Sequence, residues 1–154
     1  MNVLPGARRR RSPSALAATI AEVTRHAVVV FDGECSFCNR WVDFLLRFDR
    51  ADAFRFAARQ SEAGAAFCLR NGLPPGGVGS IIVVDGGRIL LRSDAVLQMF
   101  SRLGFPFSIL SLFRIIPAAL RDPVYDFIAR NRTRWFGTKM ACRMPSPAER
   151  HRFI

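Results

Sequence analysis

The sequence predicts an α/β fold in which helices cover a mixed sheet, with further helices near the C-terminus. Three observations predict it. The apolar run Ala27–Phe31 is followed by a stretch with helical periodicity, as in a strand–helix–strand unit. Two later apolar runs are joined by Asp-Gly-Gly, which is a strong hairpin signal. With 154 residues, half of them hydrophobic, the chain can form one domain with a hydrophobic core.

The first part of the chain alternates between strands and helices. Residues 1–25 are expected to form a flexible basic tail. Ala27–Phe31 is the kind of β-branched and aromatic run found in a strand buried on both faces. Apolar residues spaced by three and four predict a helix from Ser36 to about Arg50. A short alternating strand is predicted at Phe54–Ala57, and a second helix over Gln60–Asn71.

The next elements complete a core. Ser80–Val84 and Arg88–Leu91 are predicted as the two strands of the hairpin. Ser93 and Asp94 then supply polar side chains that can cap a third helix. The early alternation favours a parallel strand pair, and the hairpin adds an antiparallel edge. The resulting order, β-α-β-α-β-β-α, is that of a compact thioredoxin-like core, which we place at residues 26–103.

Residues 104–154 are predicted to form a helical extension packed on this core. Helical patterns cover Phe107–Ile116 and Ala118 to about Arg132, whereas the segment from Trp135 onward is irregular. The apolar run Leu103–Leu120 is interrupted by Pro106, Arg114 and Pro117. Because no span of about 20 uninterrupted apolar residues is left, we expect this run to pack on the domain rather than to cross a bilayer.

Positive charge dominates the composition. The chain has 23 Lys and Arg against 12 Asp and Glu, and Lys139 is its only lysine. This balance suits an anionic partner such as a nucleic acid, a lipid surface or an acidic protein, and equally an Arg-rich surface with no specific partner. No Arg-rich stripe accompanies a nucleic-acid-binding motif, so we expect no nucleic-acid partner and leave a peripheral contact with membranes open.

The N-terminal segment lacks the pattern of a secretory signal. Arg8–Arg11 precede a short apolar stretch, but Glu22 and Arg25 close it, and no small-residue cleavage site follows. Four cysteines are also too few for a disulfide-stapled secreted scaffold. We therefore expect a cytoplasmic protein.

The most informative feature is the pair Cys35 and Cys38, placed where the first strand gives way to the first helix. Disulfide exchange needs a thiolate nucleophile and a second thiol that resolves the mixed disulfide. A C-x-x-C pair at a helix start supplies both, because one helical turn brings the second cysteine back over the first. The helix N-terminus stabilises a thiolate at the first position, so we expect Cys35 to be the more acidic and the more accessible thiol.

Two other interpretations of the pair are open. A structural zinc site needs four ligands, typically in two close pairs, but Cys68 and Cys142 stand alone in the sequence. We therefore expect no metal and no other cofactor. In the second interpretation, the two cysteines are inert core residues inside a helix. Their position at a strand–helix junction makes this interpretation less favourable. We expect Cys68 to be a buried residue that packs in the core. Cys142 could be a core residue or a further redox partner of the pair.

Asp32 and Glu34 flank the pair. The Asp32 carboxylate could accept or return the proton of the resolving thiol. It could equally be a turn or cap residue before Gly33, and we leave both roles open. Glu34 is expected to be exposed.

Several blocks of the sequence resemble a known family. Phe31-Asp-Gly-Glu-Cys-Ser-Phe-Cys38 resembles the D-x-x-C-x-x-C signature of the DCC family of predicted thiol–disulfide oxidoreductases. The resemblance continues through Phe54-Arg-Phe-Ala57, Gln60-Ser61, Ser93-Asp-Ala95, Leu120-Arg-Asp122, Tyr125, Ala129-Arg-Asn-Arg132, Trp135-Phe-Gly137, Cys142 and Pro145. It implies a thioredoxin-like fold with Cys35 as the attacking thiol, Cys38 as the resolving thiol and Asp32 as the adjoining signature acid.

One departure concerns the position before the third core strand. Thioredoxins and glutaredoxins have a cis-proline there, facing the cysteines, whereas this sequence has Gly79-Ser80. Docking of a substrate by backbone pairing beside the cysteines is therefore not implied.

The basic and aromatic block Arg130–Phe136 allows two interpretations. Arginine and aromatic side chains together could hold an anionic ligand or stack a base. Alternatively, Trp135 and Phe136 pack the terminal segment onto the domain while the arginines stay solvated, which is the interpretation we favour.

The expected function is that of an enzyme, a dithiol–disulfide oxidoreductase of the protein-disulfide reductase type. Its partners would be a disulfide-containing protein or a small-molecule thiol, and a reducing partner. Two alternatives stay open: a redox-responsive binding module without turnover, and a basic membrane- or nucleic-acid-associated protein in which the C-x-x-C is incidental.

Overall fold

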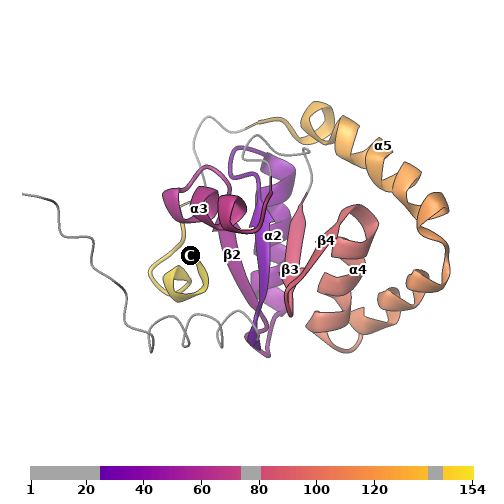
Figure 1. Cartoon of the computed structure of the whole chain (residues 1–154), viewed down its shortest axis with the longest axis horizontal. Helices are drawn as coiled ribbons and strands as arrows, with labels where there is room; N and C mark the ends of the chain where they lie inside the picture. Colours follow the sequence, from indigo (N-terminus) through magenta and orange to yellow (C-terminus); the bar gives the residue numbers. More distant parts are fainter. Residues whose placement is uncertain (1–24, 74–80, 139–143) are drawn as a thin grey trace, which may run out of the picture.

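The structure, a computed structural model, describes residues 25–73, 81–138 and 144–154. Its centre is a four-stranded sheet with the strand order β2-β1-β3-β4. The strands are β1 (Ala27–Phe31), β2 (Phe54–Ala58), β3 (Ile82–Asp85) and β4 (Arg88–Leu91). β1 pairs in parallel with β2 and antiparallel with β3, and β3 pairs antiparallel with β4. The sheet is therefore mixed, as predicted, and the order of elements is that of a thioredoxin-like fold (Figure 1).

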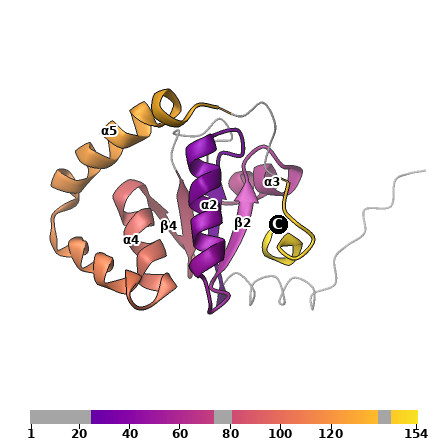
Figure 2. The ribbon, with the colours of Figure 1, turned by 180° about the vertical axis from the view of Figure 1, so that it is seen from behind.

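Helices cover both faces of this sheet. In chain order they are α2 (Ser36–Phe48), α3 (Glu62–Arg70), α4 (Arg92–Leu103), the 3-10 helix η1 (Phe107–Ile115), α5 (Ala118–Phe136) and the short 3-10 helix η2 (Arg150–Arg152). Figure 1 shows α3 in front of the sheet. Figure 2, seen from behind, shows α2 in front of the opposite face.

Strand β1 is buried on both faces because its side chains alternate between two apolar clusters. Val29 and Phe31 belong to the cluster that includes residues of α2 and α4. Val28 and Val30 belong to the cluster on the α3 side. All five residues of the strand are at most 2% exposed, which explains the continuous apolar run in the sequence.

Two predicted boundaries are shifted at the hairpin and the helix after it. β3 begins at Ile82 rather than Ser80, which lies outside the described residues. α4 begins directly after β4, so Leu91 occupies the cap position and the predicted cap by Ser93 is wrong. Ser93 instead lies in the first turn, buried, where its hydroxyl donates to Asp122 and accepts from Arg121.

The C-terminal extension also differs from the prediction. Its first helix is a 3-10 helix, and α5 continues to Phe136, four residues beyond the predicted end at Arg132. The helix stops where Gly137 adopts a positive φ of 73°. Trp135 is therefore in the last turn of a helix rather than in an irregular segment.

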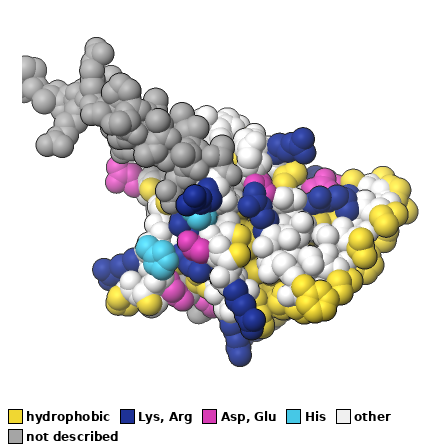
Figure 3. Space-filling model, turned by 90° about the horizontal axis from the view of Figure 1, so that it is seen from below, with side chains coloured by type: hydrophobic (Ala, Val, Ile, Leu, Met, Phe, Trp, Pro, Cys, Tyr) yellow, Lys and Arg dark blue, Asp and Glu magenta, His cyan; other side chains and the backbone are white. Residues whose placement is uncertain are grey.

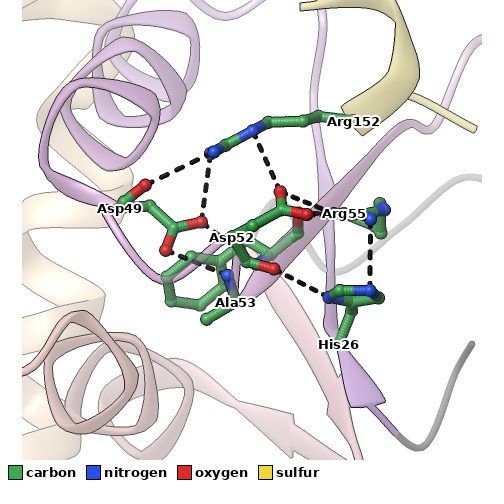
Figure 4. Close-up of polar contacts among 7 residues, drawn as sticks. His26, Asp49, Asp52, Ala53, Arg55 and Arg152 are labelled. Carbon is green, nitrogen blue, oxygen red and sulfur yellow. Dashed lines mark hydrogen bonds and ion pairs between the residues drawn. The ribbon is translucent and has the colours of Figure 1, made fainter.

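A polar cluster fastens the C-terminal residues to the start of β2 (Figure 4). The buried carboxylate of Asp49 accepts the backbone N–H groups of Ala53 and Phe54 at 2.9 and 3.2 Å. Arg152 donates to the same carboxylate at 3.1 Å, and its Nε lies 3.1 Å from Asp52. Because the Asp49 carboxylate is buried and accepts several hydrogen bonds, we expect this cluster to stabilise the fold.

The cluster lies at the end of the sheet where β1 and β2 begin. The Nδ1 atom of His26 lies 2.8 Å from the carbonyl oxygen of Asp52, and Arg55 donates to the Asp52 carboxylate at 2.9 Å. The bond from Arg55 is the main reason that the pKa of Asp52 lies below its ordinary value. The cysteine pair follows the opposite end of β1, so the two sets of residues are separate.

Candidate active site

Cys35 and Cys38 lie where the sequence predicts them, after the C-terminal end of β1 and at the start of α2. Cys35 is the N-cap residue of α2, with extended backbone angles (φ −81°, ψ 116°). Its sulfur accepts the backbone N–H of Cys38 at 3.4 Å. The Cys35 sulfur therefore accepts one of the first-turn N–H groups of α2, which have no carbonyl partner inside the helix. Such groups in general stabilise negative charge at a helix N-terminus.

Both thiols are buried, so the expected difference in accessibility is wrong. Cys35 and Cys38 are each 1% exposed. The physical reason is the chain after α5, where Thr138 forms an antiparallel bridge with Cys35. Just before it, the ring of Phe136 packs against Phe37, which lies between the two cysteines, at 5.1 Å between centroids.

Burial has a marked effect on the second thiol. It raises the pKa of Cys38 to about 12, an effect that the nearby charge of Arg132 partly opposes. The neighbouring Cys35 raises the pKa further, whereas a backbone hydrogen bond with Asp32 lowers it. Cys38 is therefore a neutral thiol at neutral pH and must lose its proton before it can attack.

For Arg132, a residue of the site, the exposure predicted from the sequence was wrong. It was expected to be solvated with its neighbours, but it is 7% exposed, whereas Arg130 and Arg134 are exposed. The reason is that the inner face of α5 packs over α2, and Arg132 is on that face. The helical spacing of Tyr125, Ala129 and Arg132 was the available signal, but it does not show which face turns inward.

An apolar cavity of about 200 Å³ adjoins the pair between α2, α4 and α5. Its lining consists of Phe37, Trp41, Ile81, Val96, Tyr125, Ile128, Ala129 and Arg132. Phe37, the residue before Cys38, and Arg132, whose charge acts on Cys38, are part of its wall, whereas neither cysteine is.

Asp32 organises the turn that carries the pair. Its carboxylate accepts the Gln60 amide at 2.6 Å and the Glu34 backbone N–H at 3.0 Å. The other end of the Gln60 amide accepts the backbone N–H of Gly33 at 2.9 Å. These bonds favour the turn-forming role of Asp32 among the two left open by the sequence.

Asn39 is a second residue that sequence reasoning missed. It is 3% exposed, one position after Cys38, and its amide donates to the Gly33 carbonyl at 2.8 Å. Its side-chain oxygen has no hydrogen-bond partner among the described residues. A polar residue on the inner face of an amphipathic helix was the only signal in the sequence.

Comparison with known proteins identifies the family. The family model described as DCC1-like thiol-disulfide oxidoreductase matches residues 29–138, which include the last three residues of β1, the cysteine pair and α5. The chain belongs to this DCC1-like family.

Two curated relatives support the assignment. The chain is 36% identical over 134 residues to the uncharacterized protein YuxK of Bacillus subtilis, a match that covers 87% of this chain and 98% of the relative. It is also 36% identical over 124 residues to a chloroplastic DCC family protein of Arabidopsis thaliana, covering 80% of this chain and 72% of the relative. No solved structure gives a significant match. A thiol–disulfide redox role is therefore supported, whereas the location expected from the sequence is not confirmed.

The other cysteines of this DCC1-like protein lie apart from the pair or are not described. Cys68 is fully buried in the cluster on the α3 side of the sheet, which confirms its packing role. Cys142 lies outside the described residues, as do Gly79 and Ser80. Within the described part of the chain, no three His, Cys, Asp or Glu side chains gather as metal ligands. The same part holds no helix long and apolar enough to cross a membrane.

Proposed function

We propose that this DCC1-like protein is a dithiol–disulfide oxidoreductase in which Cys35 attacks and Cys38 resolves. The observation that supports it best is the hydrogen bond from the Cys38 N–H to the sulfur of Cys35 at a helix N-terminus. Burial leaves Cys38 neutral, as a resolving thiol is before it acts. We place the reaction in the cytoplasm, where partner thiols are kept reduced.

The reaction has two steps. The Cys35 thiolate attacks one sulfur of a substrate disulfide, forming a mixed disulfide and releasing the first substrate sulfur as a thiolate that takes up a proton. Cys38 then loses its proton and attacks the sulfur of Cys35. This step forms the Cys35–Cys38 disulfide and releases the second substrate thiol. The substrate disulfide gains two electrons, and an external dithiol returns two to the enzyme.

Asp32, Gln60 and Asn39 are positioning residues in this scheme. Their hydrogen bonds hold the backbone of Gly33 from two sides, which fixes the turn that presents Cys35. Arg132 acts through charge, because it favours the thiolate that Cys38 must form in the second step.

A turnover assay tests the proposal. The protein is incubated with a disulfide-linked peptide and excess dithiothreitol at pH 7.5, and peptide thiols are counted against a reaction without protein. We expect many peptide disulfides to be reduced per protein molecule, and Cys35→Ser to remove the gain while Cys68→Ser retains it. A rate equal to that of the protein-free reaction would contradict the enzymatic function.

The burial of both thiols supports one other candidate, a redox-responsive binding module. Formation of the Cys35–Cys38 disulfide would alter the contacts at Thr138 and thus the surface formed by the end of α5. Such a module would exchange its disulfide stoichiometrically but not turn over. The same assay therefore separates the two candidates.

A further inference from the structure

The segment formed by η1 and α5 exposes an unusual amount of apolar surface. Eight large apolar side chains of these two elements are at least half exposed, among them Ile109 (53%) and Trp135 (52%). The other six, which we call the apolar strip, are Leu112 (61%), Phe113 (55%), Ile115 (83%), Leu120 (66%), Val124 (61%) and Phe127 (57%). Figure 3 shows hydrophobic side chains gathered along the end of the molecule where these two elements lie. Contiguous exposed patches of this kind in water-soluble domains usually mark an interaction site.

Helix α5 carries apolar residues on its outer face as well as on its inner face, unlike an ordinary surface helix. Leu120, Val124 and Phe127 recur at four and three residues and so share one face of the helix. They are exposed, whereas Tyr125 and Arg132, on the other face, line the cavity beside the cysteine pair. Core packing therefore does not account for the apolar residues of the outer face. η1 contains no buried residue at all.

The charge around the strip is positive. Residues 104–138 contain five arginines and two aspartates. Arg114, Arg130 and Arg134 are exposed. The two aspartates, Asp122 and Asp126, face Arg92 at 4.0 and 3.6 Å, so arginine already offsets their charge. An anionic surface is the complement of this arrangement.

We propose that η1 and α5 bind the surface of a membrane that contains anionic phospholipids. The apolar strip enters the boundary between headgroups and acyl chains, and the three exposed arginines contact lipid phosphates. No described helix is long and apolar enough to span a bilayer, so the segment lies on the membrane rather than across it. This interaction goes beyond the redox reaction and does not depend on it.

A second copy of the chain fits this surface less well. A two-fold symmetric contact through the strip would bring the same arginines of both copies together, and the described acidic side chains of the segment are already paired. Like charges at such a contact oppose association. An anionic phospholipid surface supplies negative charge for the exposed arginines and an apolar interior for the side chains of the strip.

Vesicle co-sedimentation of the full chain tests the proposal. We use phosphatidylcholine vesicles with and without about 30% phosphatidylglycerol, in low and in high salt. We expect at least about tenfold stronger binding to the anionic vesicles, reduced by salt. The variant Leu112→Ser/Phe113→Ser/Phe127→Ser should lose binding at least about tenfold while keeping its circular dichroism spectrum.

Matched charge variants distinguish a specific strip from general basicity. Arg114→Gln/Arg130→Gln/Arg134→Gln removes three charges beside the strip, and Arg50→Gln/Arg70→Gln/Arg88→Gln removes three exposed charges elsewhere. Only the first set should weaken binding strongly. Equal losses, or equal binding to both kinds of vesicle, would overturn the proposal. So would light scattering that finds a dimer which the serine variant dissociates while its vesicle binding is unchanged.

Discussion

The positive charge of the buried Arg132, on α5, acts on the Cys38 thiol, on α2, and opposes part of the rise in its pKa that burial causes. The two residues are distant in the chain and are brought together because α5 packs over α2. The charge opposes the effect of burial, which by itself favours the neutral thiol. The C-terminal extension therefore contributes to the chemistry of the pair as well as to its cover.

Replacing Arg132 should slow the second step of the exchange. Arg132→Met removes the charge that favours a Cys38 thiolate, so the Cys38 pKa rises and less of the reactive form is present. Each unit of pKa corresponds to about tenfold in the thiolate fraction. Rapid acid quench followed by mass spectrometry should show the mixed disulfide persisting, with its decay shifted to higher pH.

Arg134→Met is the matched control, because Arg134 is exposed on the same helix. It should leave the decay unchanged, and Arg132→Lys should restore part of the rate. A purely structural role for Arg132 would instead change both steps and would not move the pH profile.

Loosening the end of α5 should expose the cysteines. Phe136→Ala removes the ring that packs on Phe37, and the backbone at Thr138 that covers Cys35 loses its anchor. We expect alkylation of Cys35 by iodoacetamide at pH 8 to become several times faster, as measured by mass spectrometry. Trp135→Ala is the comparison, since Trp135 is 52% exposed and, among the described rings, packs edge-to-face against Phe127 alone. Equal rates in the two variants would show that the covering segment is held in another way.

The raised pKa of Cys38 predicts a loss of stability at high pH. The folded state keeps this proton up to about pH 12, whereas the unfolded chain releases it near 9.0. Between these values the folded state binds more protons, so the free energy of unfolding falls as the pH rises. Urea unfolding at pH 8 and pH 10.5 should show this fall, and Cys38→Ser should reduce it. A Cys38→Ser protein with the same pH dependence as the wild type would contradict the assignment.

The buried carboxylate of Asp49 should be important for stability. Asp49→Ala removes the acceptor of two backbone N–H groups and leaves Arg152 without this partner. We expect the free energy of unfolding to fall by about 3 kcal/mol in urea titrations, because buried charged networks are costly to break. Glu34→Ala, which removes an exposed carboxylate, should change it by less than about 0.5 kcal/mol. A similar small loss for Asp49→Ala would mean that the cluster does not fasten the C-terminal residues.

Local patterns predicted the fold well. The limits of β1 and β4 and the position of Cys35 at a strand–helix junction follow from the hydrophobic pattern and the turn residues around it. Ser93 was misplaced because a serine before an apolar run resembles a cap, but β4 enters α4 without a loop and the serine bonds across to α5 instead.

The missing parts of the site depend on contacts between distant segments. Nothing near the cysteines in the sequence shows that Thr138 will pair with Cys35, or that Arg132 will be buried beside Cys38. Both follow from the docking of α5, and helical periodicity alone does not state which of its two apolar faces turns inward. The predicted accessibility of Cys35 was wrong for the same reason.

Trapping of the mixed disulfide tests the roles of the two cysteines most directly. Each variant is incubated with a disulfide-linked peptide and separated under non-reducing conditions, and the adduct is located by mass spectrometry. Cys38→Ser should accumulate peptide on Cys35, because attack proceeds but resolution does not. Cys35→Ser should give no adduct, and Cys68→Ser should behave as the wild type. An adduct on Cys38 in Cys35→Ser, together with none in Cys38→Ser, would contradict the assigned order of attack.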